Sequence, residues 1–384
     1  MSKGTGSRRR RSGTSVMNTA KKRSDRTSSA GKKKDADDVD VDKTVDDTSE
    51  RRKKKQPSKK PSKLQKSSGL LMAKGSAADV MGKKIDSAAE EAFAAFVTKT
   101  LATGVEGLRR EFAEVKMYVP SNCEHSAFTA NEARNRYTDI ICLDATRVPL
   151  TLNVPPEPDY INANWVRMEG GGTFIATQGP LEQTIPDFWR MVHQESVSTI
   201  LMACLTEEDG KPKCAQYWPL ESGAYQTYGS MFVNNKKIEK EERVTIFTLE
   251  VLPEGCSNST ITKLVQITNW WPDRSVPQSG NGLLRMLKLV SQNSPTIVHC
   301  SAGVGRTGTM IAVHTVIERL LKGQQVNVRD VITQLRNQRA HAVQTEGQYV
   351  YIHVCALYYI SAKIRKYAEM ILPFHNEYIA AKLN

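Results

Sequence analysis

The sequence has no uninterrupted apolar run of about 18 residues, and its Arg-rich N-terminal segment is not followed by the apolar stretch of a secretory signal. These absences argue against a membrane-spanning helix and against export. We expect a soluble intracellular protein, in the cytoplasm or alternatively in the nucleus. The seven cysteines form no CxxC pair, and no cluster of histidines and carboxylates has metal-ligand spacing. A disulfide framework, a metal site and a cofactor are therefore not predicted.

Large apolar side chains are scarce in residues 1–70, so this segment cannot bury a core that would offset its ordering entropy. It holds 22 Lys and Arg against nine Asp and Glu, and its net charge of +13 therefore equals that of the whole chain. We predict a disordered basic tail over 1–70, a linker over 71–85 and one folded domain over 86–384. The tail is either a solvated spacer or a weak contact for nucleic acid or an acidic surface.

Short apolar runs and helical spacings are interleaved along the domain without a strict βαβ alternation. This pattern predicts an α/β fold, with a central twisted mixed β-sheet flanked by helices in a single domain. Strands are predicted at 173–177, 198–203, 243–251, 260–268 and 296–299. Helices are predicted at 184–192, 283–290, 309–321, 330–337 and 348–367.

Two further helices are predicted before this sheet. Apolar residues recur at three- and four-residue spacing from Phe93 onwards, and Ser87 followed by Glu90 fits a capping box at the start of that helix. A second apolar pattern over 108–115 predicts a helix that ends before Pro120. We expect both helices to pack on the domain that follows.

The segment “VHCSAGVGRTG” (298–308) can be interpreted in two ways. Its glycines form a GxGxxG, which occurs in dinucleotide-binding turns. Its Cys300 and Arg306 instead place a thiol and a guanidinium beside the same turn. Glycines let successive amides converge on one anion, and a helix expected to begin near Thr309 adds its positive end. Both interpretations therefore predict a phosphate-binding turn.

The residues around the turn favour the cysteine interpretation. Asp330 has the spacing of a ribose-binding acid, but the apolar residues after it are in helical register, so we expect it to cap a helix rather than end a strand. Arg306 has no role in a pyrophosphate turn. No Lys-Ser or Lys-Thr follows the glycines, as a P-loop would require.

The polar side chains of this segment fit chemistry on a phosphate ester. Cys300 lies beside converging amides and a helix N-terminus, which favours its thiolate at neutral pH. Arg306 can place two parallel N–H groups on a phosphoryl group and stabilise charge in the transition state. Thr307 can donate its hydroxyl to the sulfur, and His299 can orient the cysteine backbone. The remaining residues expected to line the phosphate site are Ser301, Ala302, Gly303, Val304 and Gly305.

The segment resembles the signature loop of the cysteine-dependent protein-tyrosine phosphatases, and other segments resemble motifs of that family in the expected order. Together they span most of residues 112–366, so the tail lies outside the resemblance. The resemblance implies a non-receptor, single-domain member with that family's fold, which hydrolyses phosphotyrosine in partner proteins without a metal or cofactor. We expect a monomer. The matching segments are “RNRYTDI” (134–140), “YINAN” (160–164), “IATQGP” (175–180), “PDFWRMV” (186–192), “KCAQYWP” (213–219), “WPDRSVP” (271–277) and “QTEGQY” (344–349).

The resemblance also implies roles for residues outside the signature loop. Asp273, in a mobile loop that we name the acid loop (271–277), corresponds to the general acid that protonates the leaving group and then acts as a base. Gln344, with Gln348 nearby, corresponds to the residue that positions the attacking water. Glu208 corresponds to the acidic partner of the signature arginine, with the adjacent Glu207 as an alternative.

Two more residues are expected to bind the substrate. The resemblance implies that Tyr137 stacks on the substrate ring in a cleft too deep for phosphoserine, and that Asp139 holds the substrate backbone. The acid loop departs from the family pattern, because Arg274 and Ser275 follow the acid where glycine usually stands at the second position. Loop closure could therefore be slowed. A phosphotyrosine-binding protein without turnover stays open as the alternative.

Overall fold

The computed structural model describes residues 85–268, 270 and 274–383. The described residues belong to one compact unit. The predicted tail (1–70) and all but the last residue of the predicted linker (71–85) lie outside the described residues, so these boundaries stay predictions. Trp271, Pro272 and Asp273 of the acid loop also lie outside them.

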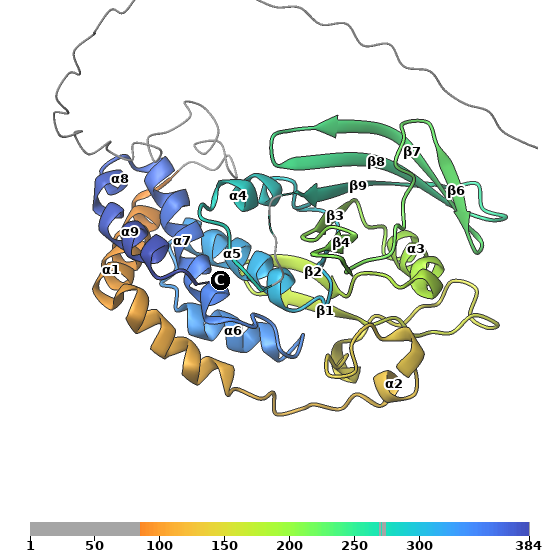
Figure 1. Ribbon diagram of the computed structural model, residues 1–384, viewed down its shortest axis with the longest axis horizontal. Coiled ribbons are helices and arrows are strands. Elements are labelled where there is room, and N and C mark those ends of the chain that lie inside the picture. Colours follow the sequence, from red (N-terminus) through yellow and green to blue (C-terminus); the bar gives the residue numbers. More distant parts are fainter. Residues whose placement is uncertain (1–84, 269, 271–273, 384) are drawn as a thin grey trace, which may run out of the picture. The chain divides into compact units, whose positions relative to one another are not determined.

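A mixed β-sheet forms the centre of the described structure, as predicted (Figure 1). Its strand order is β1-β2-β10-β3-β9-β8-β7-β6, and strands β2, β10, β3 and β9 are mutually parallel whereas the outer pairs are antiparallel. A separate two-stranded sheet is formed by β4 and β5. The strands are β1 Ala163–Met168, β2 Gly172–Thr177, β3 Thr199–Met202, β4 Glu207–Glu208, β5 Lys211–Pro212, β6 Tyr225–Tyr228, β7 Met231–Lys240, β8 Val244–Pro253, β9 Thr260–Ile267 and β10 Thr296–His299.

The five predicted strands are confirmed, with bounds that differ by at most two residues. β3 and β10 are continuous buried runs, as expected for parallel strands covered on both faces. The prediction missed β1, β6 and β7 as well as the two-residue strands β4 and β5. β7 and β6 carry many polar residues, and β7 becomes a strand because it pairs along its length with β8.

Helices cover the sheet and its edges. α5 packs on β2 and β10, α3 packs on β6, β7 and β8, and α1 lies alongside α7 (Figure 1). The predicted helices are confirmed, with bounds that differ by at most four residues. The helices are α1 Ser87–Lys116, α2 Ser126–Thr129, α3 Ile185–Gln194, α4 Asn281–Leu287, α5 Gly305–Leu321, α6 Val328–Arg336, α7 Glu346–Lys363, α8 Tyr367–Met370 and α9 Leu372–Ala380, with single 3-10 turns at Glu132–Arg134, Asp144–Thr146 and Glu182–Thr184.

The two predicted N-terminal helices are the two halves of α1. They meet at Gly104, whose φ of 64° interrupts the helix, and the next amide, Val105 N, donates to Glu377 Oε1 at 3.0 Å. The predicted capping box at Ser87 is wrong. Asp86 is the N-cap, because its Oδ1 accepts a hydrogen bond from Ala89 N at 2.8 Å.

The helix after the signature loop begins at Gly305, four residues before the predicted start. Only Gly303 among the three glycines has a positive φ, of 72°. Gly308 is needed for close packing instead, since a Cβ there would lie 2.8 Å from Val343 N, whereas a Cβ at Gly305 would meet the end of a flexible side chain, Gln344 Oε1, at 2.6 Å. The loop therefore turns at one glycine rather than at three.

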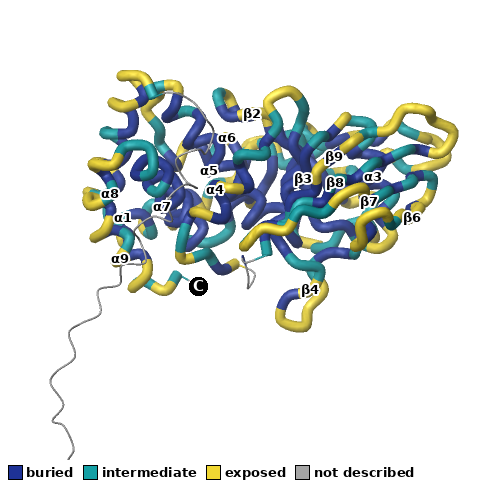
Figure 2. Tube along the Cα trace, turned by 90° about the horizontal axis from the view of Figure 1, so that it is seen from above, coloured by how far each residue is buried: buried dark blue, intermediate teal, exposed yellow. Residues whose placement is uncertain are grey.

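Burial places the signature loop in the middle of the domain. Figure 2 shows β3 and α5 largely in the dark blue of buried residues, whereas the turn beyond β4 is yellow and exposed. Cys300 follows the buried strand β10 and is itself only 3% exposed. The sheet thus fixes the start of the loop, and α5 fixes its end.

Candidate active site

Cys300 lies at the carboxyl end of β10, where the chain turns into α5. Its Sγ accepts hydrogen bonds from Gly303 N and from Thr307 Oγ1, each at 3.3 Å. Both donors and the N-terminus of α5 stabilise negative charge on the sulfur. A Cβ at Gly303 would lie 2.2 Å from Thr177 O, so only glycine fits beside the cysteine.

Arg339 also holds this loop, and the sequence did not point to it. Its Nε donates to Gly303 O at 3.1 Å and its Nη2 donates to Ala302 O at 3.3 Å. Its Nη1 donates to the Oδ1 atoms of Asn162 and Asn164, at 2.8 and 2.7 Å. Arg339 thus holds two carbonyls of the loop, while the amide of Gly303 donates to Cys300 Sγ. Complete burial lowers the pKa of Arg339.

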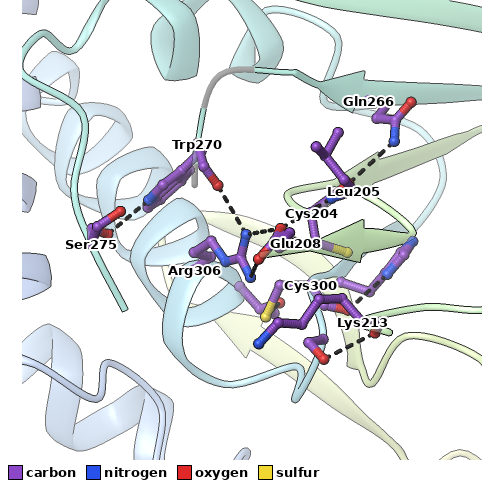
Figure 3. A network of polar contacts seen from close by, with 12 residues as sticks. Cys204, Leu205, Glu208, Lys213, Gln266, Trp270, Ser275, Cys300 and Arg306 are labelled. Carbon is purple, nitrogen blue, oxygen red and sulfur yellow. Dashed lines mark hydrogen bonds and ion pairs between the residues drawn. The ribbon is translucent and has the colours of Figure 1, made fainter. Parts of the chain in front are cut away.

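Arg306 is 1% exposed and lies between Glu208 and the backbone of Trp270 (Figure 3). Its Nη1 and Nη2 donate to the two carboxylate oxygens of Glu208, at 2.6 and 3.0 Å, and Nη1 also donates to Trp270 O at 2.9 Å. Burial alone would lower the pKa of Arg306, but the bonds to Glu208 and the charge of Cys300 raise it above its ordinary value. The guanidinium is therefore held charged and oriented.

His299 is fully buried behind the cysteine. Its Nδ1 is 3.1 Å from Cys300 O, and because a carbonyl only accepts, Nδ1 carries the proton. Nε2 is 2.7 Å from the hydroxyl of Tyr217, which lies in the segment “KCAQYWP”. The imidazole thus connects the cysteine backbone to a buried tyrosine that the sequence did not single out.

Ser301 ties the signature loop to Tyr137. Its Oγ donates to Lys213 O at 2.9 Å and lies 2.8 Å from Tyr137 Oη. A hydroxyl has one hydrogen to donate, so Tyr137 is the donor in the second bond. The ring of Tyr137 is thereby held beside the loop. Asp139, two residues later, is exposed at the protein surface.

Gln344 and Gln348 lie against Gly305 at the start of α5. Gln348 Oε1 accepts from Gln344 N at 2.9 Å, and Gln348 N donates to the N-cap Thr345 Oγ1 at 3.1 Å. The first turn of α7 therefore fixes the carboxamide of Gln348 and the backbone of Gln344 next to the signature loop. Thr345 Oγ1 also donates to Arg274 O at 3.4 Å, which connects this turn to the acid loop.

The described flanks of the acid loop change one sequence argument. Among the described residues of this loop, the positive φ falls on Arg274, at 70°, rather than on Ser275, the position at which the family pattern has glycine. Ser275 is buried, and its carbonyl accepts from Trp270 Nε1 at 3.0 Å. The backbone position that favours glycine is thus occupied by an exposed arginine. Asp273 itself lies outside the described residues.

The structure brings most of the proposed site residues together, from β10, α5, the β4–β5 hairpin and the turn before α7. Val304 is also part of this centre, because its carbonyl accepts from the amides of Gly308 and Val343, each at 3.0 Å. Asp330 lies in the first turn of α6, whose N-cap is Asn327, so it neither caps the helix as predicted nor ends a strand as a dinucleotide site would need.

The described part of the chain offers neither a metal cluster nor a membrane-spanning helix. There, no group of three or more His, Cys, Asp or Glu side chains is arranged to hold a metal ion. None of the helices built from the described residues combines the length and apolar character needed to cross a bilayer. The arrangement that remains is an anion site with a sulfur at its base and a paired guanidinium at its side.

Comparison with known proteins agrees with this geometry. Residues 131–358 match the family model of protein-tyrosine phosphatases, and the chain belongs to that family. It is 35% identical over 279 residues to the Rattus norvegicus tyrosine-protein phosphatase non-receptor type 9. This match covers 66% of this chain and 46% of that protein. It is 36% identical over 278 residues to the Homo sapiens receptor-type tyrosine-protein phosphatase eta, covering 70% of this chain and 20% of that protein.

A third relative is the receptor-type tyrosine-protein phosphatase F of Danio rerio, 36% identical over 241 residues. That match covers 61% of this chain and 12% of the relative. The chain therefore spans less than half the length of each of these three relatives. What is shared with them is the phosphatase domain.

Proposed function

We propose that this protein hydrolyses phosphotyrosine in other proteins through a cysteinyl-phosphate intermediate. The observation that carries the proposal is the environment of Cys300 Sγ, which has two hydrogen-bond donors at 3.3 Å and the Glu208-paired guanidinium of Arg306 beside the loop. A nucleophilic sulfur and a fixed cation at one anion site are what phosphoryl transfer requires, since its catalysis depends on positioning and charge stabilisation.

In the first step the Cys300 thiolate attacks phosphorus, the bond to the tyrosyl oxygen breaks, and Asp273 gives its proton to that oxygen. The amides of residues 301–305 and the guanidinium of Arg306 stabilise the charge on the phosphoryl oxygens. Protonating a phenolate leaving group is typically worth about 10²- to 10⁴-fold in rate. The products of this step are a neutral tyrosine and a phosphorylated Cys300.

In the second step water attacks phosphorus and Cys300 leaves again as a thiolate. Gln344, fixed beside Gly305, orients the water with Gln348 behind it, and the Asp273 carboxylate accepts the proton. Thr307 Oγ1, which donates to Cys300 Sγ at 3.3 Å, stabilises the departing sulfur. Inorganic phosphate is released and the enzyme is restored.

Selectivity for phosphotyrosine follows from the position of Tyr137. Its hydroxyl is held by Ser301 of the signature loop, so its ring forms one wall above the phosphate site. An aromatic substrate side chain stacks on this wall and reaches Cys300, whereas the shorter phosphoserine does not. Asp139, exposed beyond that wall, accepts hydrogen bonds from the substrate backbone.

The test is vanadate-sensitive hydrolysis of a phosphotyrosine peptide by the purified chain. Cys300→Ser is expected to abolish turnover, and Asp273→Ala to lower kcat by about 10²- to 10⁴-fold while peptide binding remains. Peptide binding by the wild type without turnover would instead support the phosphotyrosine-binding alternative. In that case Cys300→Ser would change nothing.

The finer assignments of partner and location are also proposals. We propose a weak contact of the basic residues of 1–70 with nucleic acid or an acidic surface, and with it a nuclear as well as a cytoplasmic location; a solvated spacer is the alternative. Such binding weakens steeply with salt and disappears when 1–70 is removed. Binding that survives this deletion would contradict the assignment. We further propose a monomer, which sedimentation of the full chain tests.

A further inference from the structure

The segment that follows Asp273 and leads into α4, residues 274–280, is named the return limb here. Three of its carbonyl oxygens, at alternate residues, each accept a hydrogen bond from a buried aromatic side chain. The pairs are Trp270 Nε1 with Ser275 O (3.0 Å), Tyr378 Oη with Pro277 O (2.7 Å) and Tyr351 Oη with Ser279 O (2.9 Å).

The three donors come from different parts of the chain. Trp270 precedes the acid loop, Tyr351 is on α7 and Tyr378 is on α9. The rings of Trp270 and Tyr351 meet edge to face with centroids 5.6 Å apart. Burial raises the pKa of Tyr351 and of Tyr378, so both phenols keep their hydrogen at any pH of a phosphatase assay.

Helix α9 lies beyond the residues that match the family model, which end at 358. It is fixed independently of the acid loop, because Glu377 Oε1 accepts from Val105 N at the kink of α1 and because Phe374 is buried. Tyr378 directly follows Glu377 in the sequence. The position of its hydroxyl is therefore set by α1 and α9, and the return limb is held to that position.

We propose that Tyr378 is a positioning residue for the general acid of this enzyme. Its hydroxyl holds the carbonyl of Pro277, four residues after Asp273, and so fixes the position of the C-terminal end of the acid loop. We infer that this position sets the distance from Asp273 to the leaving oxygen. This inference rests on the proposed phosphatase function.

Tyr378→Phe removes the hydroxyl and keeps the ring. One substrate is a phosphotyrosine peptide, whose leaving phenolate must be protonated, and the other is difluoromethylumbelliferyl phosphate, whose acidic phenol leaves without a proton. The measured quantity is kcat/KM, which reports the steps up to phosphorylation of Cys300. We expect kcat/KM to fall about 3- to 10-fold on the peptide, the worth of one hydrogen bond, and less than about twofold on the fluorinated substrate.

Tyr358→Phe is the matched control. Tyr358 Oη lies 3.4 Å from His375 Nδ1, so this change removes another hydroxyl between α7 and α9 that does not touch the return limb. It should leave the ratio of the two kcat/KM values unchanged. Tyr351→Phe, which frees Ser279 O, should reproduce the selective loss seen for Tyr378→Phe.

The outcomes are distinct. The positioning role would be overturned if Tyr378→Phe lowered kcat/KM equally on both substrates, or on neither. The same holds if Tyr358→Phe shows the selective loss as well. The comparison uses a variant that unfolds at the wild-type temperature. A wild-type protein inactive on both substrates overturns the proposed function and this inference with it, whereas an active wild type isolates the failure to Tyr378.

Discussion

At the scale of single residues, the ion pair between Arg306 and Glu208 determines how the anion site works. Both side chains are almost fully buried, and the two carboxylate oxygens take the two terminal nitrogens of the guanidinium. A bidentate pair fixes the plane of the guanidinium as well as its place. Removing one partner of such a pair leaves a buried charge uncompensated, which typically costs about 3 to 5 kcal/mol.

Glu208→Gln is therefore expected to lower kcat/KM on a phosphotyrosine peptide by at least about tenfold, because it weakens a charge-assisted bond that orients Arg306. Glu207→Gln is the matched control, since Glu207 is exposed on the same two-residue strand. It should stay within about twofold of the wild type. Steady-state kinetics of both proteins decide the matter, and a larger effect at Glu207 would contradict the assigned pair.

At the scale of secondary-structure elements, helix ends show how neighbouring polar residues compete for one position. Asp86 and Ser87 are both good N-cap residues, and the sequence favoured Ser87 because Glu90 follows it at the capping-box spacing. In the structure the helix begins at Ser87, and the carboxylate of Asp86 takes the free amide of Ala89. Buried Ala89 and Phe93 set this start, because they fix which side of the helix faces the domain.

Asp86→Ala should lower the free energy of unfolding by about 1 kcal/mol, the usual worth of an N-cap. Ser87→Ala should change it by less than about 0.5 kcal/mol, because exposed Ser87 is the first helical residue rather than the cap. Urea unfolding of the two variants measures the difference. Equal effects would show that the helix can shift its start by one residue.

At the scale of the whole molecule, His353 links stability to pH. It lies inside α7 and is stacked on Phe96 of α1, with ring centroids 5.8 Å apart, and its Nδ1 is 3.1 Å from Tyr349 O. Burial lowers its pKa from 6.5 to about 4. The unfolded chain therefore binds a proton below about pH 6.5 that the folded protein takes up only near pH 4.

The contribution of His353 to stability is accordingly complete above pH 6.5 and is lost as the pH falls through 4, by up to roughly 3 kcal/mol in total. His353→Gln, which cannot titrate, should remove this part of the acid sensitivity. We expect the difference in unfolding free energy between wild type and variant to be constant from pH 7 to 8 and to shift in favour of the variant between pH 6 and 4. A difference that stays constant over the whole range would contradict the buried neutral histidine.

The chemistry proposed for the signature loop, and most of the elements around it, could be predicted from the amino-acid sequence. Cys300, Arg306 and Thr307 lie within eight residues of one another, and β10 and α5 on either side are marked by apolar runs of the right period. Such signals are local, because a strand, a turn and a helix start depend on neighbouring residues. Strands β6 and β7 were not predicted from the sequence, because they form through pairing with a neighbouring strand rather than through the pattern of their own residues.

The distant groups around the site became visible only in the folded domain. Glu208 rather than Glu207 meets Arg306 across 98 residues of chain, Arg339 reaches back 36 residues to Gly303, and Tyr378 reaches Pro277 across 101. Likewise, among the described residues of the acid loop, the backbone position that favours glycine is Arg274, whereas the sequence pattern pointed to Ser275. A hydrogen bond between remote residues leaves no periodic trace in the sequence, since its geometry exists only once the sheet, α7 and α9 have packed together.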